Sequence, residues 1–399
     1  GINQDEAMGA MDAWALSKYG TDRFGTFMPV HFAAWQTSQM SVLLSYCMIP
    51  FIKIFGFHTV TVRLPMLLVS CTAVALVYLV GKKLFDERIA MAAMLLAAVN
   101  PWQFMQSRWS LDCNLFPHVF LLAFYLLLLG LEKRRYLYVS MIFFGLTFYC
   151  YGIAAYSVTA FLFVFFVWCL WKRQFRFREG VLCALIFTLV ALPEVVVLGI
   201  NAIHFGRTIE TPFFTMPYFP YSVRSADILL LNFSFEQLGK NIWALFSHVF
   251  LQLPDIFFNS IPAFGPLYHV SIPFVLVGII VFTVRLFREK ETEKQTRMLA
   301  LWGFLITGIW VGLITYEVNI NRVNIIFYPL ILLCAYGIRL AVDRWRKLLP
   351  VIAVAYGISS VLFFAAYFTS YAAESGKYYN KDFLNAVAEA DSMEAYDSL

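Results

Sequence analysis

The chain opens with two adjacent carboxylates. Asp5 and Glu6 stand at the start of a helix-like stretch that runs to Gly20. A buried or interfacial carboxylate must be hydrated, paired, metal-bound or catalytic, because desolvating it without a partner is very costly. The simpler interpretation is helix capping, since acidic residues in a first turn gain about 0.3–1 kcal/mol from the helix dipole. The two residues alone leave both interpretations open.

A second polar group lies in the segment that joins two apolar stretches. It contains Arg108, Asp112 and Asn114. Arg108 and Asp112 are four residues apart and could simply pair with each other. Ionisable residues at membrane depth cost about 2.5–3.5 kcal/mol on insertion scales, however, so they tend to mark functional sites.

A third polar group precedes the apolar stretch that starts at residue 323. Arg322 stands there between asparagines, of which Asn321 is the nearest. An arginine in this position faces lipid headgroups or a phosphate. Snorkelling to headgroups is the simpler interpretation, but the asparagines form a hydrogen-bonding cluster that anchoring alone does not need.

Composition excludes a water-soluble protein. Hydrophobic residues make up 61% of the 399 residues and charged residues 14%, against roughly 45–50% and 25% in soluble domains. The net charge of +5 does not indicate nucleic-acid binding, because the basic residues form short clusters between apolar runs. The seven cysteines are scattered without a C-x-x-C pair, so they predict neither a disulfide framework nor a thiolate metal site.

Apolar windows long enough to cross a bilayer predict an all-α polytopic membrane protein. The ten predicted spans are 63–81, 89–107, 114–131, 136–152, 155–171, 180–199, 270–287, 298–315, 323–341 and 349–368. The loops between alternate spans hold 19 of the 30 Lys and Arg residues. By the positive-inside rule these loops face the cytoplasm.

The remaining segments then face outward. They include a first outer loop over residues 1–62, a second over 200–269, and the tail 369–399. A chain that starts outside needs a preceding span, so we expect an N-terminal helix before Gly1 and eleven spans in all. The apolar stretch 41–56 is short and carries a lysine, which predicts an interfacial helix rather than a crossing. Residues 1–368 would form the transmembrane domain.

With these residues in place, the sequence resembles the GT-C class of polyprenyl-phosphate-sugar-dependent glycosyltransferases, and most closely its bacterial family 39. That class includes the protein O-mannosyltransferases and the lipid A aminoarabinose transferase. The resemblance runs over about residues 4–340. It rests on the order of short motifs, namely Asp5-Glu6-Ala7, Arg63-Leu64-Pro65, Asn100-Pro101-Trp102, Asp112-Cys113-Asn114, Tyr149-Cys150-Tyr151-Gly152 and Asn321-Arg322-Val323-Asn324.

The resemblance implies a sugar donor on a polyprenyl monophosphate, a hydroxyl acceptor (lipid, glycan or protein) and a catalytic carboxylate in the first outer loop. Asp5 matches that carboxylate, and Glu6 would hold the acceptor. A single displacement needs one base, and the phosphate leaves as an anion without protonation. Arg108 and Arg322 suit that phosphate because a guanidinium binds it with two donors. Asp112 would position the sugar or an optional metal.

Donor or sugar binding would also involve Asn114 and Asn321. Where the aminoarabinose-type enzymes carry an acidic-basic-proline signature, this chain has Thr37-Ser38-Gln39-Met40, which puts a metal site of the family type in doubt. The predicted outward histidines lack the spacing of metal ligands; they are His31, His204, His248 and His269. We therefore assign no residue as a metal ligand. The resemblance still allows a divalent metal as cofactor.

Two other classes of function fit a polytopic chain. A transporter or lipid-linked-sugar flippase should show internal repeats and broken, charged helices at mid-membrane. No repeat relates the two halves of this chain, and Pro193-Glu194 is the best such feature. A structural or polymer-assembly protein should lack paired acidic and basic groups on one face.

The predicted location is the bacterial plasma membrane, with the active site facing outward.

Overall fold

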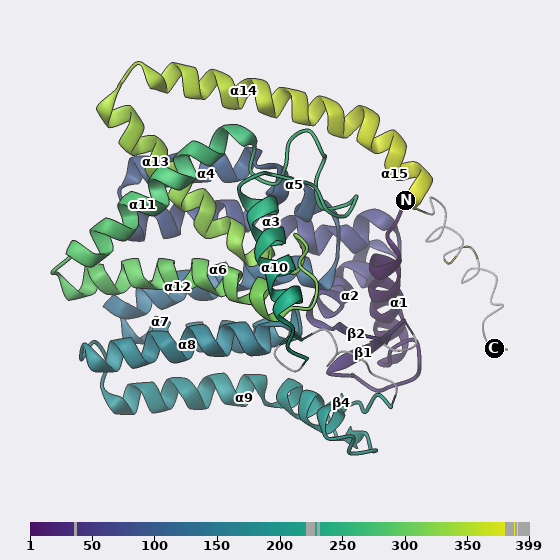
Figure 1. Ribbon diagram of the computed structural model, residues 1–399. Coiled ribbons are helices and arrows are strands. Elements are labelled where there is room, and N and C mark those ends of the chain that lie inside the picture. Colours follow the sequence, from purple (N-terminus) through teal and green to yellow (C-terminus); the bar gives the residue numbers. More distant parts are fainter. Residues whose placement is uncertain (36–37, 221–227, 230–231, 380–386, 388, 390–399) are drawn as a thin grey trace.

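The computed structural model describes residues 1–35, 38–220, 228–229, 232–379, 387 and 389. Its long helices lie side by side, and α1, α2, β1 and β2 gather at one end of them (Figure 1). Within the described residues, eight helical segments are long and apolar enough to cross a membrane: Thr59–Leu84 (α3), Asp112–Glu132 (α6), Ala154–Trp171 (α8), Phe177–Ala202 (α9), His269–Arg288 (η3 and α11), Thr292–Ile314 (α12), Asn324–Arg344 (η4 and α13) and Leu348–Ser375 (α14 onward). The prediction of an all-α integral membrane protein is confirmed.

The other two predicted spans each consist of two shorter helices. Residues 89–107 form α4 (Glu87–Val99) and α5 (Pro101–Arg108), and residues 136–152 form α7 (Arg134–Leu146) followed by η1 (Thr147–Tyr149). A helix of 13 residues rises only about 20 Å, less than the roughly 30 Å hydrocarbon core. The break between α4 and α5 follows from local sequence, because Asn100 is extended and its side chain caps α5, where Pro101 occupies the first position.

The predicted cytoplasmic loops meet at one end of the bundle. Glu132 accepts from Lys83 Nζ at 2.9 Å and from Arg297 Nη2 at 2.8 Å. Arg134 Nε at the start of α7 lies 3.1 Å from Glu179 Oε1 at the start of α9. Loops far apart in sequence therefore share one end, as alternating spans require.

The predicted outer segments meet at the opposite end. The first outer loop is bonded to the second, because Val30 N donates to Thr215 O at 2.9 Å. The second is also bonded to the segment after α12, where Asn241 Nδ2 donates to Thr315 O and Ile320 N to Asp255 Oδ2. The two large loops and the segment before η4 thus form one layer over the ends of the spans.

The first outer loop contains a helix, a hairpin and a second helix. Helix α1 (Gln4–Tyr19) begins at the N-cap Asn3 and ends at Gly20, whose positive φ of 72° suits glycine. Strands β1 (His31–Ala34) and β2 (Ser38–Ser41) pair antiparallel. Helix α2 (Leu43–Phe55) has 13 residues and packs against α1 and α3. It is too short to cross, as the prediction of a non-crossing helix required.

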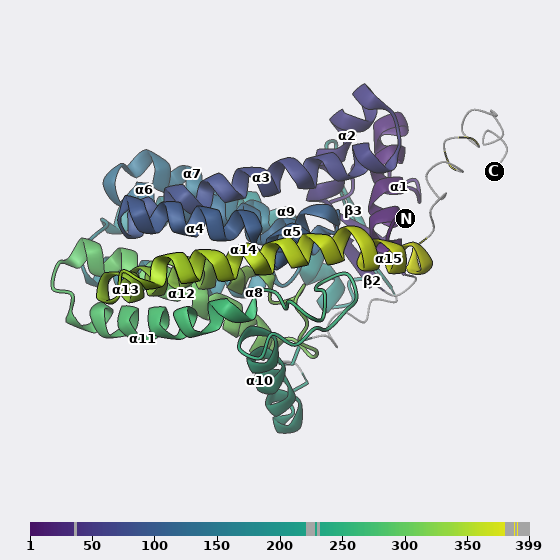
Figure 2. The ribbon, with the colours of Figure 1, turned by 90° about the horizontal axis from the view of Figure 1, so that it is seen from above.

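The second outer loop contains strands β3 (Ile209–Glu210) and β4 (Thr215–Met216), which pair with each other, and helix α10 (Phe235–Val249). Figure 2 shows α10 projecting sideways from the bundle. At the C-terminal end, α14 (Leu348–Ala366) continues through the π-helical turn η5 (Tyr367–Tyr371) into α15 (Ala372–Tyr378). Of the predicted outer tail 369–399, the structure describes residues 369–379, 387 and 389.

Candidate active site

The Glu6 carboxylate is completely buried and fully occupied. Its Oε1 accepts from Arg63 Nε at 2.9 Å and from Ser110 N at 2.8 Å. Its Oε2 accepts from Arg63 Nη2 at 2.7 Å and from Asn3 N at 3.1 Å. Four donors leave no free oxygen for an acceptor, so this geometry does not favour the acceptor-binding role expected for Glu6. The residue instead joins α1 to α3 and to the start of α6.

Asp5 has a different environment, because successive helical side chains point about 100° apart. It is partly exposed, and its Oδ1 accepts from Trp35 Nε1 at 2.8 Å. The N-cap of α1 is made by the Asn3 side chain, with Glu6 completing the capping box. Asp5 also lies in the first turn, where the helix dipole favours a carboxylate, and its side chain is partly exposed.

Asp112 contacts the same hairpin at β2, whereas Asp5 contacts it at Trp35. Its Oδ2 accepts from Ser41 N in β2 at 3.0 Å, and its Oδ1 accepts from Cys113 N at 2.7 Å. Asp5 and Asp112 both lie close enough to Cys113 to act on its thiol electrostatically. The hairpin thus brings together two carboxylates that are 107 positions apart in sequence.

Arg108 does not pair with Asp112, which contradicts the simpler interpretation of their spacing. Its Nη1 donates to Tyr367 Oη at 2.9 Å. Its guanidinium lies over the Trp109 ring at 4.7 Å and near the Tyr367 ring at 5.7 Å. In the part of the chain that the structure describes, no carboxylate lies within ion-pair distance of Arg108.

The asparagines brace the segments that carry these charges. Asn114 Nδ2 donates to Trp109 O at 3.0 Å, and Asn324 Nδ2 donates to Cys113 O at 2.8 Å. Asn321 Oδ1 accepts from Gln106 Nε2 at 3.3 Å. These bonds join the start of α6 to the segment before α13, so they hold two of the predicted polar groups against each other.

Arg322 lies apart from this bracing. Its Nη1 donates to Glu317 O, within its own loop, at 3.0 Å, and the contact is exposed. The geometry is compatible with an exposed phosphate contact and with snorkelling to headgroups. The hairpin therefore links Asp5 to Asp112, whereas Arg322 bonds within its own loop.

Sequence reasoning missed two close contacts between carboxylates and basic side chains of the first outer loop. His31 Nδ1 lies 2.8 Å from Glu194 Oε1, and both side chains are 1% exposed. Glu194, the feature that most suggested a transporter, thus has a partner in the first outer loop. Asp12 pairs with Arg23 at 3.0 Å, yet burial raises the pKa of Asp12 from 3.8 to about 7. In the described residues no three His, Cys, Asp or Glu side chains gather as metal ligands would.

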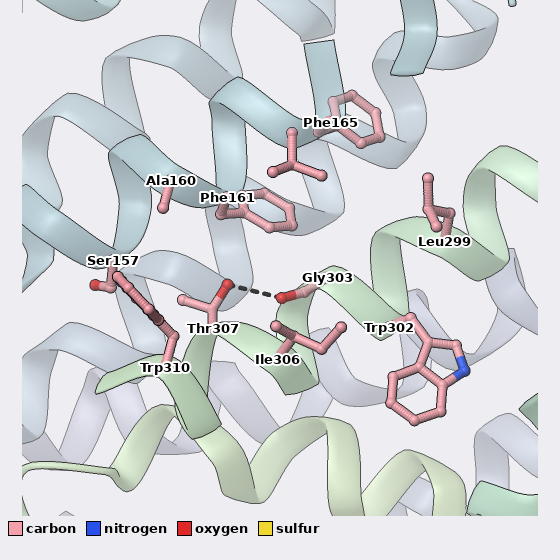
Figure 3. A pocket seen from close by; sticks show the side chains of 11 residues that line it. Ser157, Ala160, Phe161, Phe165, Leu299, Trp302, Gly303, Ile306, Thr307 and Trp310 are labelled. Atoms are coloured by element: carbon pink, nitrogen blue, oxygen red, sulfur yellow. Dashed lines mark hydrogen bonds between the residues drawn. The ribbon is translucent and has the colours of Figure 1, made fainter. Parts of the chain in front are cut away.

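A cavity of about 310 Å³ lies between α8 and α12. Figure 3 shows Phe161, Trp302 and Trp310 around it. No charged side chain is among its lining residues. This cavity therefore suits hydrocarbon and is separate from the charged residues of the outer layer.

Comparison with known proteins agrees with the resemblance that the motifs suggested. The family model described as dolichyl-phosphate-mannose-protein mannosyltransferase matches residues 40–197. By sequence, no protein of curated function matches the chain.

Among solved structures, the fold is similar to that of ArnT from Cupriavidus metallidurans bound to undecaprenyl phosphate, with TM-score 0.55 and 12% identity over 89% of this chain and 59% of ArnT. The apo form of ArnT gives TM-score 0.56 and 11% identity, over 89% of this chain and 58% of ArnT. The oligosaccharyltransferase of Archaeoglobus fulgidus, in complex with Zn and sulfate, gives TM-score 0.57 and 14% identity over 91% and 48% of the two chains. The chain therefore has the GT-C fold, and it spans about half to three fifths of the length of these neighbours.

Proposed function

We propose that this protein is an inverting glycosyltransferase that moves a sugar from a polyprenyl monophosphate to a hydroxyl acceptor at the outer face of a bacterial plasma membrane. The observation that carries the proposal is the Asp5 carboxylate, partly exposed in the same layer as Arg108, a cation without a carboxylate partner among the described residues. A base and an anion site in one layer are what this displacement requires. The family match and the GT-C fold support it.

In the proposed step, Asp5 takes the proton of the acceptor hydroxyl as its oxygen attacks the anomeric carbon. The new carbon–oxygen bond forms while the bond to the phosphate oxygen breaks, and the electron pair leaves with the phosphate. No acid is needed for the leaving group, because the lipid phosphate departs as an anion that Arg108 and Arg322 can stabilise. Trp35 would orient Asp5, and Asp112 would hold the hairpin that carries Trp35.

The test of this proposal is turnover with a radiolabelled polyprenyl-phosphate sugar in proteoliposomes. Asn keeps the shape of Asp but cannot take a proton at neutral pH, so Asp5→Asn should lower transfer by about 10²–10⁴-fold. Glu210→Gln, which changes an exposed carboxylate of the second outer loop, is the matched control and should retain full activity. Full turnover by Asp5→Asn would remove Asp5 from the mechanism.

The proposed orientation is tested by labelling with a membrane-impermeant maleimide. Single cysteines at Tyr19 and Phe55, both well exposed at the ends of α1 and α2, should react from outside in a background without the seven native cysteines. A cysteine at Arg346, in a predicted cytoplasmic loop, should react only after permeabilisation. Labelling of one of the first two and not the other would contradict the proposed outer loop of residues 1–62.

We further propose that residues 1–368 form the catalytic domain.

A further inference from the structure

The turn Tyr367–Tyr371, between α14 and α15 (Figure 1), is π-helical. Such turns are rare and often lie at functional sites. Here the turn stacks Tyr367 on Tyr371, with ring centroids 5.4 Å apart and planes at 22°. Phe104 packs edge-on against Tyr367 at 4.8 Å. The Tyr367 hydroxyl is thereby fixed against α5, the helix that ends at Arg108.

Arg108 ends in an environment that is rich in rings and poor in negative charge. Trp109 is fully buried, and its ring lies near the guanidinium groups of both Arg63, at 4.9 Å, and Arg108, at 4.7 Å. Arg63 is neutralised by Glu6, whereas no described carboxylate neutralises Arg108. A partly buried cation is costly without an anion, so Arg108 is a favourable place for one.

The donors of Arg108 are available for that anion. Its Nη1 is engaged by Tyr367, and no described residue accepts a hydrogen bond from Nε or Nη2. A guanidinium edge of this kind matches two oxygens of a phosphate. Tyr367 fixes the edge by holding Nη1, because the other contacts of the group are ring faces that set no direction for its N–H bonds.

We propose that Tyr367 is a positioning residue: through its hydroxyl, the π-helical turn fixes the guanidinium edge of Arg108 that would meet a phosphate monoester. The role of Arg108 at the phosphate of a polyprenyl donor is part of the proposed function, on which this inference rests. Arg322 is then a secondary contact, because its guanidinium makes an exposed hydrogen bond within its own loop. Free inorganic phosphate shares the same chemistry, so the test must separate the two sources.

The test is direct binding to the purified full chain in detergent, with farnesyl phosphate, farnesol and inorganic phosphate as probes. Farnesyl phosphate should bind the unchanged protein, and Arg108→Ala should weaken it by about tenfold or more. Arg108→Lys should recover part of the loss because it keeps the charge without the fork. Tyr367→Phe, which removes only the hydroxyl, should weaken binding by about 2–10-fold. Farnesol should bind weakly and equally to all variants.

Tyr356→Phe is the matched control, because it removes a tyrosine hydroxyl from the same long helix, where it bonds Ser271. It should leave farnesyl phosphate binding unchanged. In transfer assays Tyr367→Phe should raise the KM for donor and leave the KM for acceptor unaltered, which loss of folding would not do.

Equal binding by Arg108→Ala and the unchanged protein would overturn the subsite, and unchanged binding by Tyr367→Phe would overturn the positioning role. Equally tight binding of inorganic phosphate would overturn the lipid source. Because binding needs no turnover, an inactive protein that still shows this dependence on Arg108 would refute only the proposed transfer.

Discussion

Asp5 and Glu6 are neighbours in sequence and opposites in environment. Glu6 is buried and accepts four hydrogen bonds, two of them from Arg63. Asp5 is partly exposed and accepts from Trp35 in the hairpin. A rotation of about 100° along α1 thus separates a carboxylate that holds the outer layer together from one that lies partly exposed beside the hairpin. The type of residue is similar, and the partners supplied by distant segments decide its role.

The largest effect expected from this comparison is on stability. Glu6→Ala would leave Arg63 partly buried without its anion, and breaking such a pair typically costs about 3–5 kcal/mol. Thermal unfolding in detergent should show the loss. Glu210→Ala, at an exposed position, should change the unfolding midpoint little.

A second variant separates lost pairing from general damage. In Glu6→Leu with Arg63→Met, no unpaired charge remains, so much of the stability should return. An unfolding midpoint of Glu6→Ala close to that of the unchanged protein would show that the two sides of α1 do not differ as the geometry indicates.

The second prediction concerns the hairpin that contacts the two partly exposed carboxylates, Asp5 and Asp112. Asp112→Ala removes the acceptor of Ser41 N, which should let the hairpin and Trp35 shift relative to Asp5. A displacement of about 1 Å in a catalytic group can cost about 100-fold, so transfer should fall by about 10–100-fold. Asp112→Asn keeps an oxygen that can accept from Ser41 N and should lose much less. Equal losses for the two variants would indicate that the charge of Asp112, rather than its hold on the hairpin, matters.

Local sequence could predict that the chain lies in a membrane, and it could predict most of the helices. Apolar length and basic loops give the spans, and Asn100-Pro101 carries the signal for the break that the predicted span 89–107 ignored. The placement of Asp5, Arg108 and Asp112 at one end of the bundle could be expected from the alternation of spans, because all three fall in segments on the predicted outer side. The burial and full hydrogen bonding of Glu6 could not be predicted, because its partners are Arg63, 57 positions away, and the backbone amide of Ser110. Trp35 and Tyr367 carried no local signal at all.

The third prediction uses Asp12, a third carboxylate of α1, and has the smallest expected effect. Its side chain is 1% exposed. Burial, opposed by Arg23 and reinforced by Asp22, raises its pKa from 3.8 to about 7. The folded state therefore binds the proton more tightly than the unfolded state does. The stability that this group contributes is fully present below about pH 4 and is lost as the pH rises to about 7. Asp12→Asn removes the titrating group, so its unfolding midpoint should vary less between pH 4 and pH 7 than that of the unchanged protein. The measurement is thermal unfolding across that range in one detergent, with Glu210→Gln as the control that keeps the original slope. If Asp12→Asn kept that slope as well, Asp12 would not be the group that titrates between pH 4 and pH 7.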